Sequence, residues 1–185
     1  MDSRIILYFR SMKIHILALG NSIKTYQLQS GITTIGVNNI YDYFRTNYLF
    51  CGDLIRRFPK ERFLTIRTST PRKFYSHLPC WEPFFGERME KISYASVRGS
   101  MDEIDSDKYV HSIISPFTAC HIAYKLGAKE ITLFGVDLIN HPNVTGEKIE
   151  RVKKDFAGMR IAFQNKGVAL LLGNPESSAL KDIFK

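Results

Sequence analysis

Residues 115–137, SPFTACHIAYKLGAKEITLFGVD, decide the fold class of this chain. Ser115 and Pro116 predict a helix start, because serine is a favoured N-cap and proline suits the first helical turn. Apolar residues then recur at helical spacing until Gly127, which is suited to end the helix. Residues 131–136 form a short apolar run that ends at Asp137, typical of a buried strand in a parallel sheet. This unit predicts an open α/β sheet with a helix N-terminus, a ready phosphate site, near its ligand-binding edge.

Strand and helix patterns alternate along most of the chain. The other strand patterns cover residues 14–19, 33–37, 48–51, 63–66 and 168–172. The helical patterns cover residues 22–30, 39–46, 116–126, 146–165 and 177–184. This alternation predicts a three-layer α/β domain with a mostly parallel sheet and right-handed crossovers. Residues 70–112, rich in proline and aromatic residues, predict an irregular excursion: a lid, a small subdomain or a packed connection.

Length and composition fit one domain over residues 1–185, with 44% hydrophobic residues. Arg10 and Lys13 interrupt the apolar run near the N-terminus, so we expect a cytoplasmic protein without a signal peptide. Met12 directly precedes the first strand, and residues 1–11 are expected to be a leading extension or the result of an upstream start. Three widely spaced cysteines do not form a disulfide framework.

The formal net charge is +8, and basic residues are dense between residues 56 and 73. They are Arg56, Arg57, Lys60, Arg62, Arg67, Arg72 and Lys73. Such a basic face is either a solvated surface or a contact surface for phosphorylated ligands, nucleic acid or an anionic membrane.

Short polar side chains follow several of the predicted strands. These residues are Asn21, Asn38, Asn39, Asp53 and Asn174. Each one alone suits a turn, but amides and acids at one edge of a sheet also hydrogen-bond bases, ribose and sugar hydroxyls. Their repetition predicts a shared binding site at the carboxyl edge of the sheet.

Four motifs resemble those of the bacterial lipooligosaccharide sialyltransferases. Gly20-Asn21-Ser22 resembles their nucleotide loop, and Gly36-Val37-Asn38-Asn39 their second-strand asparagine segment. Residues 115–137 resemble their serine- or threonine-led helix and following strand, and residues 171–178, LLGNPESS, their late strand and turn. The same core pattern resembles that of the related 6-hydroxymethylpterin diphosphokinase-like proteins.

The resemblance implies a variant Rossmann, GT-A-like fold and a glycosyltransferase that uses a nucleotide-activated sugar, with CMP-sialic acid as the family's donor. It implies that Asn21, and Asn38 or Asn39, hold the nucleotide, with Gly20 and Ser22 in the same loop. Ser115 and the amides after it would face the donor or its phosphate, and Asn174 and Ser177 would line the same cleft. The chemistry would need no metal and would use a histidine as general base.

His141 is the general base that the sequence favours, because it follows the strand at 131–136 and precedes the helix at 146–165. The alternative is a loop histidine that caps the next helix. Asp137 would position a ribose, a sugar hydroxyl or Mg²⁺, or would instead bond the neighbouring loop.

Two other functions stay open. If Asp53 and Asp137 meet, they would suit Mg²⁺ and a pyrophosphate, as in a phosphoryl or pyrophosphoryl transferase. The basic face would suit a non-catalytic module that binds nucleic acid or protein. A P-loop, a complete dinucleotide fingerprint and a serine-hydrolase elbow are all absent from the sequence, which argues against those classes.

Overall fold

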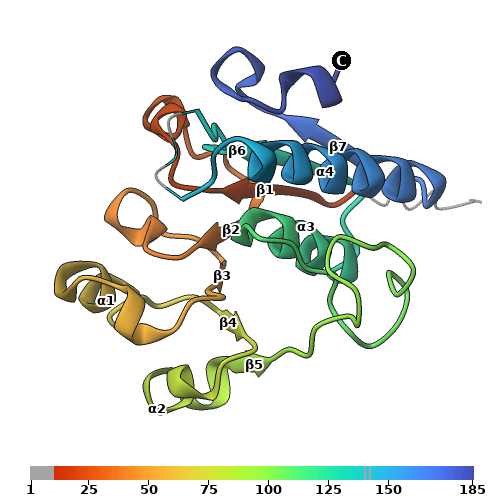
Figure 1. Ribbon diagram of the computed structural model, residues 1–185. Helices are drawn as coiled ribbons and strands as arrows, with labels where there is room; N and C mark the ends of the chain where they lie inside the picture. The colour runs from red at the N-terminus through yellow and green to blue at the C-terminus, as the bar shows by residue number, and fades with distance from the viewer. Residues whose placement is uncertain (1–10, 140, 142) are drawn as a thin grey trace, which may run out of the picture.

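The computed structural model describes residues 11–139, 141 and 143–185, and these residues build one parallel sheet with helices on both faces (Figure 1). The sheet order is β5-β4-β3-β2-β1-β6-β7, and every pairing is parallel. The strands are β1 (Lys13–Leu17), β2 (Thr33–Val37), β3 (Tyr48–Phe50), β4 (Lys73–Ser76), β5 (Met89–Lys91), β6 (Glu130–Phe134) and β7 (Ala169–Leu172). This confirms the predicted α/β, three-layer class.

Four α-helices and several single turns of 3₁₀ helix connect the described strands. The α-helices are α1 (Lys60–Arg67), α2 (Glu82–Phe85), α3 (Ser115–Lys125) and α4 (Glu147–Asn165). The 3₁₀ turns are η1 (Asn21–Thr25), η2 (Ile40–Asp42), η3 (Ile55–Arg57), η4 (Pro79–Trp81), η5 (Gly86–Arg88), η6 (Pro175–Ser177) and η7 (Lys181–Ile183). The predicted helices at 22–30, 39–46 and 177–184 are therefore no more than short turns.

Alternate residues of the central strands point into two separate cores. Ile14 and Ile16 of β1 pack with Phe117 of α3 and Phe156 of α4, whose rings meet edge to face at 5.3 Å. Leu17 belongs to the other core, which the 3₁₀ turns, α1 and α2 cover. Figure 1 shows α3 and α4 together on one side of the sheet. Because both faces of the sheet are covered, even the polar residues within these strands, His15, Thr34 and Thr132, are buried.

The predicted strand at residues 63–66 is wrong, because these residues lie within α1. Phe63 and Ile66, three positions apart, lie on the inner side of the helix, and Phe63 packs 6.2 Å from Trp81. Leu64 between them is 41% exposed. The stretch 63–66 is only four residues long, which is too short to distinguish a helical apolar pattern from the alternating pattern of a strand.

Residues 70–112 are more regular than predicted, since they contain β4, α2 and β5. Phe74 and Tyr75 are buried strand residues, and β4, not residues 63–66, is the strand that follows β3 in the chain and pairs with it. The irregular part is the 92–114 segment, which runs alongside α3. The ring of His121 on α3 fastens it: Val110 N donates to Nδ1 at 2.9 Å, and Nε2 donates to Ile104 O at 2.8 Å.

The chain reverses its direction of travel across the sheet at β1. Strands β2 to β5 are added on one side of β1, and α3 then carries the chain back to β6 on the other side. Such a switch point opens a crevice at the carboxyl ends of the two central strands, where open α/β sheets bind ligands. Because α3 and α4 flank β6 in the chain, α3 begins and α4 begins at this same carboxyl edge.

Among the described residues, no helix combines the length and apolarity needed to cross a bilayer.

Candidate functional site

The loop after β1 is held against the end of β6. Gly20 N donates to Gly135 O at 2.7 Å, and Ser22 N donates to Asp137 Oδ2 at 2.9 Å. The hydroxyl of Ser22 donates to the other oxygen of the same carboxylate. A Cβ on Gly20 would lie 2.6 Å from the Asp137 carboxyl carbon, so glycine is required for this approach. Asp137 thus bonds the neighbouring loop, which leaves Asn21 exposed beside it.

The turn after β7 joins the same edge. Asn174 Nδ2 donates to Thr25 Oγ1 of η1 at 3.0 Å, and Ala179 N donates to Asp137 O at 2.8 Å. Ser177 is exposed on η6 between these two contacts. The structure therefore brings the predicted residues Gly20, Asn21, Ser22, Asp137, Asn174 and Ser177 to one end of β1, β6 and β7.

Two asparagines follow β2 at the same edge. Asn38 has a left-handed backbone with φ of 53°, a conformation that asparagine tolerates better than most residues. The side-chain oxygens of Asn38 and Asn39 are buried and have no hydrogen-bond partner among the described residues. Asn39 is anchored through its amide nitrogen, which donates to Asp42. A buried acceptor without a partner is costly, so this pair is the strongest indication of a ligand.

Ser115 opens α3 at this edge, one residue further into the helix than predicted. Ile114 is the N-cap, and it makes no side-chain capping bond. Pro116 has no N–H group and Phe117 N donates to Ile114 O at 3.3 Å, so the first turn offers few free amides, but the positive end of the helix dipole still favours an anion there.

A cluster that the sequence did not predict lies at the ends of β3 and β4. The ring of Tyr94 lies between two histidines, with centroid distances of 4.3 Å to His77 and 4.4 Å to His111. A Cβ on Gly52, just after β3, would lie 3.2 Å from the Tyr94 hydroxyl. The Nδ1 atoms of both histidines are buried without a partner among the described residues.

Burial controls the protonation of this cluster. It lowers the pKa of His77 and of His111, and the nearby charge of Arg98 lowers the pKa of His111 further. Burial also raises the pKa of Tyr94. Both histidines are therefore neutral at pH 7, the form in which an imidazole can accept a proton.

His141 uses its ring nitrogen within its own loop. Nδ1 accepts hydrogen bonds from Asn143 N and Val144 N, both at 3.1 Å. In the neutral ring this leaves the proton on Nε2, and burial lowers the pKa of His141. The assignment of His141 as general base stays a prediction, and it requires these two bonds to open.

The two acids considered for Mg²⁺ do not meet. Asp53 follows β3 and pairs with Arg57 at 3.3 Å, whereas Asp137 follows β6 and binds Ser22. Three strand intervals separate β3 from β6, which is about 14 Å. Across residues 11–139, 141 and 143–185, no group of three or more His, Cys, Asp or Glu side chains could hold a metal ion. The carboxylate pair that favoured a phosphoryl transferase is therefore not formed.

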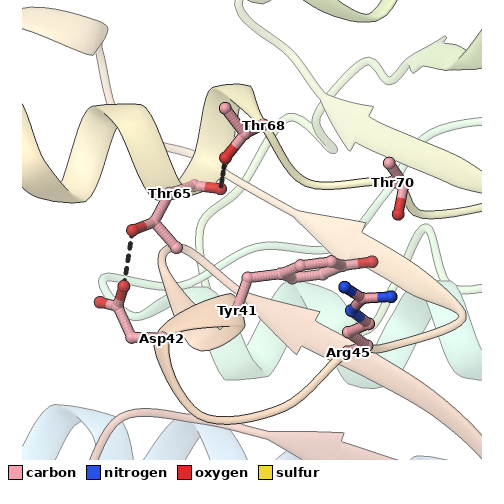
Figure 2. Close-up of a pocket in the computed structure, with 6 residues that line it drawn as sticks. All are labelled: Tyr41, Asp42, Arg45, Thr65, Thr68 and Thr70. Carbon is pink, nitrogen blue, oxygen red and sulfur yellow. Dashed lines mark hydrogen bonds between the residues drawn. The ribbon is translucent and has the colours of Figure 1, made fainter.

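A polar hollow of about 450 Å³ lies between η2 and α1 (Figure 2). Tyr41, Asp42 and Arg45 line one side, and three threonines of the α1 region line the other. Thr65 Oγ1 donates to Asp42 at 2.6 Å across it. None of the predicted site residues lines this hollow, but Asn39 is hydrogen-bonded to Asp42 in its wall.

The basic face predicted between residues 56 and 73 lies on η3, α1, the loop after it and the first residue of β4. Arg57 pairs with Asp53, Lys73 pairs with Glu90 at 3.3 Å, and Arg67 lies 5.5 Å from the centre of the Phe84 ring. A role for this face in binding nucleic acid or membranes stays a prediction.

Comparison with known proteins identifies the fold. No protein-family model matches the chain, and no curated protein matches it. Solved structures of sialyltransferases do match. They share the arrangement of strands and flanking helices, and at their low identity the similarity shows the fold.

Three of these structures illustrate the similarity. The sialyltransferase CstII from Campylobacter jejuni in complex with CMP-3FNeuAc has a TM-score of 0.59 and 14% identity, over 94% of this chain and 84% of that chain. The sialyltransferase CST-II in complex with a trisaccharide acceptor and CMP has a TM-score of 0.57 and 14% identity, over 93% and 84%. The apo alpha-2,3-sialyltransferase from Campylobacter jejuni has a TM-score of 0.54 and 17% identity, over 100% and 83%. The resemblance to diphosphokinase-like proteins stays a prediction.

Proposed function

We propose that this chain is a glycosyltransferase-like enzyme that takes a nucleotide-activated sugar, with CMP-sialic acid as the donor to test first. In the transfer step the acceptor hydroxyl oxygen bonds to the anomeric carbon of the sugar. The bond from that carbon to the phosphate oxygen breaks, and CMP leaves with the bonding electrons. The hydroxyl proton passes to a histidine.

The orphan oxygens of Asn38 and Asn39 carry this proposal. They are hydrogen-bond acceptors, and the amino group of cytosine and the hydroxyls of ribose are donors that would satisfy them. They follow β2, the neighbour of β1, and so lie one strand from the switch point between β1 and β6, the region where open α/β sheets hold nucleotides. Asn21 and the Gly20–Ser22 loop, fixed by Asp137, would contact the same ligand from the other side.

The leaving phosphate is assigned to the start of α3. No side-chain cap occupies this helix end, so the positive end of its dipole can stabilise negative charge that grows on the phosphate as the glycosidic bond breaks. Asn174 and Ser177 would close the crevice beyond β7. The solved structures of similar fold include complexes with CMP and with a trisaccharide acceptor and CMP, which supports this choice of donor.

Three histidines compete for the proton. His141 is favoured by its place after β6, but its Nδ1 is used by two backbone amides. His111 lies four residues before α3, and its Nδ1 has no partner among the residues that the structure describes. The local geometry favours His111 over His141, and His77 on the other side of Tyr94 is the third candidate.

A thermal-shift series tests the function. CMP, UDP, GDP, ATP and a short oligonucleotide are each compared with and without magnesium, since a ligand that binds only the folded state raises Tm. We expect stabilisation by CMP that does not depend on magnesium. Stabilisation by ATP with magnesium alone would point to a phosphoryl transferase, and stabilisation by the oligonucleotide alone to a nucleic-acid module. Either result would overturn the proposal.

A further inference from the structure

A second hollow, which we call the α4 hollow, lies between α4 and the loop at residues 98–100. Its volume is about 680 Å³. Its lining includes Arg98, Gly99, Arg151, Lys154, Asp155 and Gly158. None of the residues predicted from the sequence belongs to it.

The charge of the hollow is strongly one-sided. Arg98, Arg151 and Lys154 are exposed, and none of them forms an ion pair within the described part of the chain. The single carboxylate in the lining, Asp155, is 7% exposed and accepts a hydrogen bond from Ser112. Three cations around one tied carboxylate leave a net positive concave surface, which attracts anions.

Two glycines shape the hollow. Gly99 has φ of 80°, and a Cβ there would lie 2.3 Å from Asp155 Oδ1, so the loop can approach α4 only with glycine. Gly158 lies inside α4, where glycine costs about 1 kcal/mol relative to alanine. A Cβ at Gly158 would meet nothing within 4 Å, so packing does not require the glycine. Its effect is to leave the floor of the hollow open.

The α4 hollow lies beside the segment that carries His111, one of the candidate proton acceptors. Gly99 N donates to His111 O at 2.8 Å, and the bond from Ser112 to Asp155 fixes the next residue of the same segment to α4. An anion in the hollow would therefore lie close to the backbone of His111 and Ser112, just before the start of α3.

We infer that the α4 hollow binds an anionic group, a carboxylate or a phosphate, carried by the acceptor saccharide. This inference rests on the proposed function, because it assigns the acceptor side of the same site. Arginine and lysine both suit such oxyanions, and arginine can hold them with two parallel hydrogen bonds.

Binding to three matched hexoses tests the inference. Galactose, galacturonate and galactose 6-phosphate share one ring and differ at carbon 6, and each is titrated calorimetrically with and without CMP. We expect the two charged sugars to bind and galactose to bind at least about tenfold more weakly, since a hydrogen bond to a charged group is worth about 1.5–3 kcal/mol. Tighter binding of galacturonate would identify the anionic group as a carboxylate, and tighter binding of galactose 6-phosphate would identify it as a phosphate. Equal affinity for galactose 6-phosphate and inorganic phosphate would overturn the assignment to a saccharide.

Variants on one helix locate the binding. The double variant Arg151→Gln, Lys154→Gln should lose at least about tenfold in affinity for the charged sugars, whereas Lys153→Gln, which removes a lysine paired with Glu150 at 2.7 Å, should keep it. Gly158→Met should fill the floor and abolish binding without loss of helix stability. Unchanged affinity in Gly158→Met would overturn the inference even if the charge variants weaken binding.

Failure of this inference can be told from failure of the proposed function. If CMP binds but no charged sugar does, the hollow is not the acceptor site and the proposed function stands. If charged sugars bind through Arg151 and Lys154 but no nucleotide binds, the proposed function fails while the hollow keeps its ligand.

Discussion

The carboxylate of Asp137 accepts one hydrogen bond from the backbone amide of Ser22, at 2.9 Å, and another from the hydroxyl of the same residue. This contact spans 115 positions of sequence and joins the ends of β6 and β1. It fixes the loop that carries Asn21 at the switch point of the sheet.

Asp137→Asn should lower the free energy of unfolding by about 1–3 kcal/mol, because the amide replaces one buried acceptor with a donor that faces an N–H or O–H group. Urea denaturation measures this change. Asp182→Asn is the matched control, since it removes an exposed acid paired with Lys185 and should leave the midpoint nearly unchanged. Equal shifts in the two variants would contradict the structural role of Asp137.

Asn38→Gly should weaken CMP binding by at least about tenfold, because it removes the orphan acceptor while glycine accepts the left-handed backbone. Asn38→Ala should lose the same affinity and also about 1 kcal/mol of stability from backbone strain. Asn165→Ala, an exposed residue at the far end of α4, is the control for titration by calorimetry. Full CMP affinity in Asn38→Gly would remove this residue from the site.

His111→Phe should abolish turnover and keep CMP binding, because the ring still stacks on Tyr94 but has no nitrogen to accept a proton. The sequence-based prediction places the same loss on His141→Ala. Steady-state rates of the two variants, measured side by side, decide between them. Burial lowers the pKa of either histidine below 6.5, so the acid limb of kcat/KM should lie below pH 6.5.

Stability should fall in mild acid because of His121. Burial lowers its pKa to about 4 in the folded protein, against 6.5 for an unperturbed histidine. The unfolded chain therefore binds a proton that the folded chain does not between those values, and the free energy of unfolding rises with pH across that window. The contribution is about 3 kcal/mol, present above pH 6.5 and lost as the pH falls to 4.

Urea denaturation at pH 7 and pH 5, together with the NMR titration of His121, checks this dependence. A His121 resonance that titrates near 6.5 would contradict it.

The sequence predicted the central elements because their patterns are long and consistent. Strands β1, β2 and β6 each carry buried apolar residues after their first position, and α3 and α4 show clear helical spacing, so these elements lie within a few residues of the prediction. Strand β5 has only three residues, two of them charged, at the edge of the sheet, and no pattern marks it. Helix α1 has an exposed leucine, Leu64, so its apolar residues do not form a clear helical face in the sequence.

The site residues, like the elements of the fold, were predicted in part. The polar residues that directly follow strands were predicted because chain position alone puts them at the carboxyl edge. His77 was missed because β4 was missed, although the run Lys73–Ser76 before it could have revealed a strand end. His111 and Tyr94 could not be predicted, since their stacking depends on the path of the 92–114 segment, which has no periodicity.

The 92–114 segment should respond to acid differently from the sheet. Tyr94 and His111 both lie on it, and the imidazole of His121 is hydrogen-bonded to two of its backbone groups. When that ring gains a proton, its Nδ1 faces the Val110 amide donor to donor, and we expect this contact to open while the strands are still paired. Activity should therefore disappear, reversibly, at a milder pH than the one that unfolds the sheet.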